Sequence, residues 1–388
     1  MNNKKYIILG TDDAALAAVN SIRMIDTDAE IKMVSRKTYK PYSTSLLPAY
    51  ICGELDEEAL FFKGQNEIKK LNVDYVVSDK TEILVGSKEV MYKDGTKNQY
   101  DKLLITQNNS DRPAMDLEGI SVYDLATFEG CKNLKERLKK DVRLAILGND
   151  ESAIQFAAKI SQTGVQVTIV TAEESLVAYF NENMRLRILT LLQNKGVKII
   201  CGTSVLRAEK DTNGTSLILK DHDPILVDCV ATATNYAMVD DKNLCSDEYF
   251  KTSTDDIYAA VSYQDIPEAV VQGKIAGLNM AGEKIKYTTP IKRILVQIFD
   301  EEFFHVGLRK DSYNESCEIL KGDSLNLIYH DEQLVGIDVA NQKFIHPGVF
   351  SYLIRNHVSI KNYEKLLVEK TRETALYLMN QDRKKQII

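Results

Sequence analysis

The sequence predicts an α/β protein in which one strand–turn–helix unit occurs twice. Residues 6–18 read YIILGTDDAALAA, and residues 144–157 read LAILGNDESAIQFA. Each segment is an apolar strand followed by a glycine, a short polar stretch and an alanine-rich helix. The glycines of the two turns, Gly10 and Gly148, lie a whole domain length apart. The repeat therefore indicates two domains of one kind and not a short-period array.

Helices and strands alternate after the first turn. Apolar runs and turn residues predict a strand at Tyr6–Leu9, a helix at Ala14–Met24, a strand at Glu30–Ser35, a helix around Leu46–Gly53, a β-meander over 73–100 and a strand at Lys102–Thr106. The turn Lys93-Asp94-Gly95 interrupts the meander. A loop at 108–113 and a helix at Leu125–Lys140 then lead to the second unit.

The second unit shows the same alternation. Its predicted elements are the strand Arg143–Leu147, the helix Ser152–Gln162, the strand Gln166–Val170, the helix Asn183–Asn194 and the strands Val197–Cys201, Ser204–Lys210, Ser216–Lys220 and Ile225–Ala231. The pair Lys195-Gly196 is a helix-ending signal. A short strand at Ile257–Ala260 and a helix at Ile266–Met280 follow. From Pro290 the pattern changes to strands, with a final helical segment at Tyr363–Asn380.

These elements predict an α/β fold of two Rossmann-like three-layer (ββα) domains, the second inserted in the first, plus a C-terminal α/β domain. We place the first domain at residues 1–112 and 240–288 and the second at residues 113–239. The C-terminal domain covers residues 289–388.

The composition is that of an ordinary globular protein and disfavours several functions. Of the 388 residues, 44% are hydrophobic and 27% are charged, with a formal net charge of −7. The negative charge argues against nucleic-acid binding. No apolar run approaches the roughly 18 residues that a membrane-spanning helix needs. The opening residues MNNKKYIILGTDD predict a first strand and not a secretion signal, so we expect a cytoplasmic protein.

Cysteines and histidines form no recognisable metal or redox motif. The six cysteines include no C-x-x-C pair, and the five histidines include no H-x-x-x-H pair. Scattered cysteines of this kind are typical of reduced thiols in a cytoplasmic protein. Neither G-x-S-x-G, a P-loop nor H-E-x-x-H occurs. We therefore predict no metal site and no catalytic residue.

The two turns carry the frame of a dinucleotide-binding loop with altered residues. Such a loop reads G-x-G-x-x-G, and its second glycine lets the backbone approach the pyrophosphate. The three glycine positions are held by Gly10, Asp12 and Ala15 in the first turn and by Gly148, Asp150 and Ala153 in the second.

An aspartate at the second position opposes a bound phosphate. Two unit charges about 5 Å apart repel each other by about 3 kcal/mol at an effective dielectric constant of roughly 20. A helix N-terminus, in contrast, attracts a carboxylate through its unpaired N–H groups and its partial positive charge. We predict that Asp12 and Asp150 cap their helices and take the place of a phosphate. The simpler interpretation is that both are ordinary caps in a fold that binds no nucleotide.

Four stretches of the chain carry a family resemblance. They are the opening segment with Pro41-Tyr42-Ser43, the strand entry Tyr100-Asp101-Lys102, the segment from QVTIV to ENMRLRILTLLQNKGVKI, and EAVVQGKIAGLNMAGE at 268–283. In their order they resemble the FAD-dependent pyridine nucleotide-disulfide oxidoreductases, in particular rubredoxin and ferredoxin reductases and the flavin domain of NADH nitrite reductases. The resemblance covers almost the whole chain and implies FAD and NAD(P)H as cofactors. It also implies that the C-terminal domain, residues 289–388, serves as an interface.

The positions that contact the cofactors in that family differ here. Besides Asp12 and Asp150, the substituted positions are Lys37 for the ribose-binding acid, Thr44 for an arginine, Thr106-Gln107-Asn108 and Ala231-Thr232-Ala233 for Ala-Thr-Gly, Val261-Ser262 for the ribityl-binding Gly-Asp, and Thr171 for an acid. Each lost contact weakens binding by about 1–3 kcal/mol. Together they predict that FAD and NAD(P)H bind weakly or not at all.

We therefore expect a family member that has lost its redox site and works as a scaffold or regulatory subunit beside a redox partner. One alternative is an active NAD(P)H:FAD oxidoreductase that passes electrons to a small iron–sulfur protein. Another is a sensor that binds a smaller nucleotide or an anion through Lys37, beside Arg36 and Lys40.

The remaining expectations concern packing and partners. We predict that Tyr39, Tyr42 and Tyr50 fill the space of the vacated flavin pocket. We expect a homodimer or a subunit of a redox complex, with neither nucleic acid nor a membrane as partner.

Overall fold

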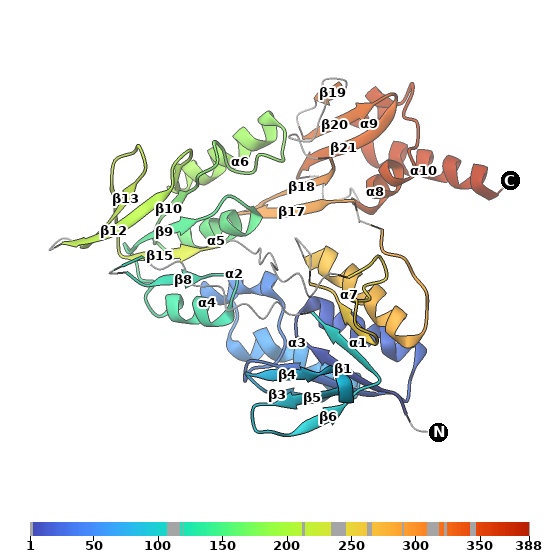
Figure 1. Cartoon of the computed structure of the whole chain (residues 1–388). Helices are drawn as coiled ribbons and strands as arrows, with labels where there is room; N and C mark the ends of the chain where they lie inside the picture. The colour runs from blue at the N-terminus through green and yellow to red at the C-terminus, as the bar shows by residue number, and fades with distance from the viewer. Residues whose placement is uncertain are drawn as a thin grey trace. The chain divides into compact units, whose positions relative to one another are not determined.

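The computed structural model of this chain contains two compact units. It describes residues 3–106, 117–118, 120–211, 214–233, 246–261, 266–288, 291–308, 318–321, 324–341 and 347–387. The first unit comprises Met1–Pro113 and Asn235–Pro290, and the second comprises Ala114–Thr234 and Ile291–Ile388. Figure 1 shows the course of the chain through both units.

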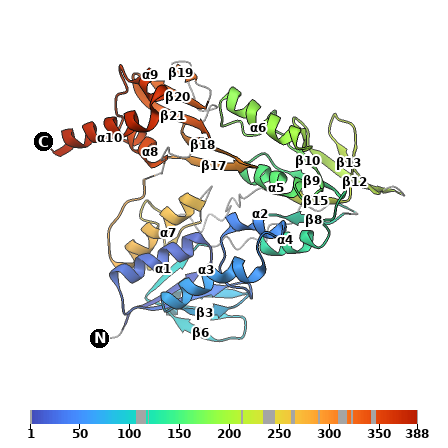
Figure 2. The same cartoon turned by 180° about the vertical axis from the view of Figure 1, so that it is seen from behind.

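A parallel five-stranded sheet forms the centre of the first unit. Its order is β16-β7-β1-β2-β3, and every neighbouring pair is parallel. The strands are β1 (Lys5–Leu9), β2 (Glu30–Ser35), β3 (Asp74–Val77), β7 (Lys102–Ile105) and β16 (Ile257–Ala259). One face carries α1 (Asp13–Ile25), α3 (Glu57–Lys70) and α7 (Ile266–Ala281), which lie in front of the sheet in Figure 2. The short elements η1 (Thr44–Leu46) and α2 (Leu47–Ile51) precede α3.

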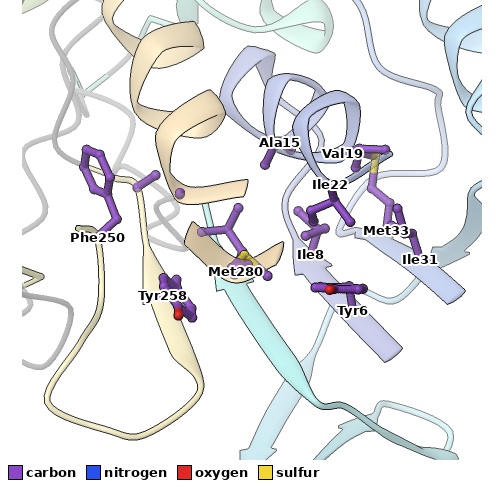
Figure 3. Packing of buried hydrophobic residues seen from close by; sticks show 14 of the residues in the cluster. Tyr6, Ile8, Ala15, Val19, Ile22, Ile31, Met33, Phe250, Tyr258 and Met280 are labelled. Atoms are coloured by element: carbon purple, nitrogen blue, oxygen red, sulfur yellow. The ribbon is translucent and has the colours of Figure 1, made fainter. Parts of the chain in front are cut away.

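Helices α1 and α7 pack backbone to backbone. A Cβ atom on Gly273 would lie 2.0 Å from the carbonyl oxygen of Ala14, and one on Gly277 would lie 2.4 Å from that of Ala18. The two glycines, four residues apart, therefore form one face of α7 that has room for no side chain. Figure 3 shows the core beneath these helices, where side chains of α1, α7 and the sheet meet, among them Ile8, Ile22 and Met280.

An antiparallel three-stranded sheet covers the other face of the parallel sheet. It consists of β4 (Thr81–Leu84), β5 (Glu89–Tyr92) and β6 (Lys97–Gln99), with the short element η2 (Val85–Ser87) between the first two. The predicted meander over 73–100 is therefore wrong in its first strand, because β3 pairs in parallel with β2. Period-two alternation marks a strand but does not say which neighbour it pairs with.

The Tyr92 hydroxyl in this layer is buried, and no hydrogen-bond partner for it lies within the part of the chain that the structure describes. Burial raises the pKa of Tyr92 to about 12, so the hydroxyl remains a neutral donor. A buried donor without an acceptor costs about 1–3 kcal/mol. We expect Tyr92→Phe to raise the free energy of unfolding by about 1 kcal/mol in a denaturant titration. A loss of stability would show that the hydroxyl is satisfied.

Asp256 forms ion pairs with Lys102, the first residue of β7, and with Lys88, which directly precedes β5 of the antiparallel sheet. Hydrogen bonds from the Lys102 and Lys88 ammonium groups lower the pKa of Asp256 to about 2. Because the carboxylate is stabilised in the folded state, its contribution is present above the ordinary pKa of about 3.9 and is lost as the pH falls through about 2.

We expect Asp256→Asn to cost about 1 kcal/mol at neutral pH, a figure reduced for solvent screening of a side chain that is 23% exposed. The difference between the variant and the wild type should shrink below about pH 4. Unfolding curves at several pH values measure it. The matched control is Asp255→Asn, since the Asp255 side chain is 91% exposed.

The second unit begins with another five-stranded parallel sheet. Its order is β11-β10-β9-β15-β8. The strands are β8 (Val122–Asp124), β9 (Arg143–Leu147), β10 (Gln166–Val170), β11 (Lys198–Ile200) and β15 (Cys229–Thr232). The helices of this part are α4 (Phe128–Lys135), α5 (Glu151–Ser161) and α6 (Glu182–Asn194). An antiparallel sheet of β12 (Val205–Asp211), β13 (Gly214–Leu219) and β14 (Ile225–Val227) accompanies it.

The C-terminal segment of the second unit is an antiparallel sheet under helices. The sheet order is β17-β18-β21-β20-β19. Its strands are β17 (Arg293–Ile298), β18 (Glu301–Gly307), β19 (Glu318–Lys321), β20 (Leu325–His330) and β21 (Gln333–Ala340), and its helices are α8 (Pro347–Arg355), α9 (Glu364–Glu369) and α10 (Thr371–Ile387). The helical segment predicted at Tyr363–Asn380 consists of α9 and most of α10.

The C-terminal segment shares a compact unit with residues 114–234. The three-domain division predicted from the sequence stays a prediction. No helix in the described ranges is both long and apolar enough to cross a bilayer. The described residues likewise contain no group of three or more metal-ligating side chains gathered in one place.

Candidate functional site

The first dinucleotide-type turn lies between β1 and α1. Gly10 has a φ of 143° and donates its N–H to the carbonyl oxygen of Val34, which ties the turn to β2. Asp12 is the N-cap of α1, and its Oδ1 accepts the N–H of Ala15 at 2.9 Å. A side-chain carboxylate thus occupies one of the donors at the helix terminus that a bound phosphate would otherwise use.

The second turn, between β9 and α5, repeats this geometry. Gly148 has a φ of 157° and donates to the carbonyl oxygen of Val170. Asp150 is the N-cap of α5, and its Oδ1 accepts the N–H of Ala153 at 3.0 Å. The two turns differ in burial, since Asp150 is only 6% exposed whereas Asp12 is half-buried. The second turn is therefore the more enclosed of the two.

At each helix terminus the carboxylate opposes the approach of a dinucleotide pyrophosphate. Each neutralises the partial positive charge at its helix terminus and brings a negative charge to the place of phosphate approach. The repulsion against one phosphate charge about 5 Å away is about 3 kcal/mol at an effective dielectric constant of roughly 20. A matched pair of caps in the two units accounts for both substitutions by one physical effect.

Lys37 lies just beyond the end of β2 and is exposed. The Ser35 hydroxyl donates to its carbonyl oxygen, and its own N–H donates to the Ser35 hydroxyl. Arg36 donates to the carbonyl oxygen of Asp79, and the Lys40 ammonium lies 3.9 Å from the centre of the Tyr75 ring. Arg36, Lys37 and Lys40, which the sequence predicted to form a basic cluster, therefore contact different parts of the chain.

The tyrosines near the first turn pack against α3. The rings of Tyr39 and Tyr42 contact each other and the ring of Phe61, with centroid distances of 5.5–5.7 Å. Tyr50 is buried in α2 and donates to Glu57. That these tyrosines fill a flavin pocket stays a prediction, and the structure adds Phe61, which the sequence argument missed together with all of α3.

Two cavities accompany the parallel sheet of the first unit. One, of about 180 Å³, runs beside the first two turns of α1 and is bordered by Asp13, Tyr42 and Glu67. The other, of about 500 Å³, lies at the amino ends of β1, β2 and β3. Ligands of such sheets bind at the carboxyl ends of the strands, so the second cavity is not part of the dinucleotide site.

Several of the other altered positions lie at or just after the ends of strands, whereas Thr44 lies in a short helical element. Thr171 follows β10 and its hydroxyl accepts the N–H of Glu173, while Ala233 follows β15 and is fully buried. Thr44 begins η1. Val261 is buried after β16, whereas Ser262 and Asn108 lie outside the described residues.

The variant Asp12→Gly, which removes the first cap, distinguishes two states of the first turn. In a closed site, side chains fill the cofactor pocket; in a blocked site, the pocket is open and Asp12 alone obstructs it. In a closed site, Asp12→Gly loses the cap and gains backbone freedom in the unfolded chain, so it should cost about 1 kcal/mol, and at most about 2. Added FAD should then leave the denaturation midpoint unchanged. A clear rise of the midpoint with FAD would mean that Asp12 alone blocks an open pocket.

Comparison with known proteins places the chain in a family. The model of the pyridine nucleotide-disulphide oxidoreductases matches residues 4–273. This chain belongs to that family.

Individual relatives share about a quarter of their residues with this chain. The chain is 26% identical over 390 residues to the NADH-dependent phenylglyoxylate dehydrogenase subunit epsilon of Aromatoleum evansii, covering 91% of this chain and 92% of that protein. It is 23% identical to the rubredoxin-NAD(+) reductase of Pseudomonas putida, covering 86% and 95% of the two chains.

Among solved structures, the reductase in a covalent putidaredoxin reductase–putidaredoxin complex superposes with a TM-score of 0.80 at 16% identity, covering 96% of this chain and 100% of that chain. This match supports the predicted fold class of paired Rossmann-like domains.

Proposed function

We propose that this protein is a non-redox subunit, a scaffold or regulatory partner, of an oxidoreductase complex. The observation that carries the proposal is the matched pair of caps, in which Asp12 and Asp150 occupy helix termini that would otherwise face a dinucleotide. The relatives support a place in such a complex. One is named as a subunit of an NADH-dependent dehydrogenase, and another is named as the ferredoxin–NAD(+) reductase component of a dioxygenase.

In this proposal the family's cofactor positions persist without holding FAD or NAD(P)H. Those positions are Gly10, Asp12, Ala15, Lys37, Gly148, Asp150 and Ser262. The same proposal includes a cytoplasmic location and assembly either with a redox partner or as a homodimer.

The visible spectrum of the purified chain tests the proposal. A protein without flavin is colourless, whereas oxidised flavin absorbs near about 450 nm. We expect no such band, and co-purification of a second polypeptide from the native host. A flavin band in the freshly purified chain would contradict the proposal.

The second candidate is an active NAD(P)H:FAD oxidoreductase that passes electrons to a small iron–sulfur protein. The retained turn glycines favour it, because both have a positive φ, and the first glycine of a dinucleotide-binding loop allows its tight turn. The names of the relatives favour it as well, since they include NADH- or NAD(+)-dependent reductases and oxidases.

Calorimetry with NADH, and turnover with added FAD and an artificial acceptor, separate the two candidates. The scaffold proposal expects neither tight binding nor turnover. Micromolar binding, or turnover above about 1 s⁻¹, would favour the active enzyme. Asp150→Gly is the matched variant, since relief of the repulsion alone should restore NADH binding only if the second pocket is open.

A further inference from the structure

Strand β12 is an edge strand of the second unit. The small antiparallel sheet has the order β12-β13-β14, so β12 pairs with β13 on one side only. Over the described ranges, no other hydrogen bond reaches the backbone of Val205–Asp211. The sheet lies at one end of the second unit in Figure 1. An edge of this kind presents a row of unpaired N–H and C=O groups that another strand can satisfy.

The two faces of β12 differ in polarity. Ala208 packs toward the core that the small sheet shares with the parallel sheet of this unit. Its neighbours Arg207 and Glu209 therefore lie on the opposite, outer face. Their side chains form an ion pair at 2.6 Å and are 61% and 52% exposed. An ion pair with this exposure contributes little to folding, so its two charges can be changed without unfolding the chain.

The order of charges along β12 is self-complementary. When two copies of one strand pair antiparallel and symmetrically, the two-fold axis passes through a residue, which lies opposite its own copy. The centres that pair most of the strand are Arg207, Ala208 and Glu209. A centre at Arg207 or at Glu209 places like charges opposite each other on the axis. A centre at Ala208 places Arg207 of each copy opposite Glu209 of the other.

The rest of the strand is compatible with the centre at Ala208. The β-bulge between Val205 and Arg207 lies toward one end of the pairing and leaves Arg207–Asp211 in regular register with β13. Leu206, which is 56% exposed, would lie near Lys210 of the second copy. The hydrocarbon stem of a lysine covers an exposed leucine while its ammonium group stays in water.

We propose that β12 pairs antiparallel with β12 of a second copy of this chain, about a two-fold axis at Ala208. The small sheet of each copy then continues into the other. Backbone hydrogen bonds supply the attachment, and the two Arg207–Glu209 pairs fix the register. The contact is the size of one strand, so the association is reversible and not permanent. This inference gives the homodimer of the proposed function a surface, but it does not rest on the loss of cofactors.

Charge reversal on the outer face tests the register. Arg207→Glu places carboxylates opposite each other, and Glu209→Arg places guanidinium groups opposite each other. Each variant alone should therefore self-associate at least about tenfold more weakly than wild type. An equal mixture of the two variants should dimerise again, because every opposite pair then joins unlike charges. Sedimentation velocity of the full chain, between about 1 and about 200 μM, measures the association.

Two further variants serve as controls. The double variant Arg207→Glu with Glu209→Arg keeps unlike charges opposite each other, so it should associate as wild type does. Arg372→Glu changes an exposed charge on α10, away from β12, and should also leave the association unchanged. Circular dichroism of each variant checks that the chain is folded.

Hydrogen exchange of the wild-type chain locates the contact. Amides of segment 205–211 should exchange more slowly at about 200 μM than at about 1 μM, whereas those of β14 should not change. A chain that stays monomeric over this range, a mixture of the two charge variants that does not dimerise, or a dimer without added protection of segment 205–211 would overturn the proposal. None of these results alters the flavin test of the proposed function, so the two can fail separately.

Discussion

Gly273→Ala is expected to destabilise the first unit by at least about 3 kcal/mol, because the added methyl group collides with backbone and not with a movable side chain. The new Cβ would stand 2.0 Å from the carbonyl oxygen of Ala14. Helices α1 and α7 would have to separate, which opens the core drawn in Figure 3. Denaturant unfolding followed by circular dichroism measures the loss.

The matched control is the same substitution at Gly348, which also lies on a helix but has open space around it. Gly348→Ala should be neutral or stabilising by up to about 1 kcal/mol, because alanine favours a helix over glycine. Opposite signs for the two variants would show that the effect comes from contact and not from helix propensity. A loss below about 1 kcal/mol at Gly273 would mean that α1 and α7 are less closely packed than described.

Asp338→Ala is expected to cost about 3–5 kcal/mol, because it removes the acceptor of several buried hydrogen bonds, and each buried donor left without an acceptor costs about 1–3 kcal/mol. The variant leaves the His305 ring and two donors of Asn181 buried without their acceptor. A urea titration, with the slope checked for two-state behaviour, measures the cost. Asp79→Ala is the control, because Asp79 pairs with Lys93 at the surface, and it should change stability little.

A small effect of Asp338→Ala, close to that of the surface control, would show that water can replace the carboxylate as the acceptor for Asn181 and His305. If Gly273→Ala loses folded protein and Asp338→Ala does not, the first unit is the less stable part of the chain.

Strands with unbroken apolar runs could be predicted from the sequence. The bounds of β2, β9 and β10 agree with the prediction, because a buried parallel strand is apolar on both faces and ends at polar turn residues. Helix α3 was missed although Asp56 caps it and apolar residues recur at helical spacing, as at Leu60 and Ile68. Many charged residues on its outer face hid that pattern.

Some contacts of the candidate site could likewise be predicted from the sequence, and others could not. The caps at Asp12 and Asp150 could be predicted because a cap lies three residues from its donor, so the whole interaction is local in sequence. The hydrogen bonds from Asn181 to Asp338 could not be predicted, because the two residues are 157 positions apart and no local pattern relates them. The separate partners of Arg36 and Lys40 were equally out of reach, since they depend on the fold around Asp79 and Tyr75.

The flavin content of the purified chain, measured before and after reconstitution, tests most directly the claim that the turns capped by Asp12 and Asp150 hold no cofactor. Purified protein is incubated with excess FAD, passed through a desalting column and denatured, and the released flavin is measured. The account predicts far less than one FAD per chain in both samples, with no gain after incubation. About one FAD per chain in either sample would contradict it, because a pyrophosphate would then be bound where Asp12 caps α1.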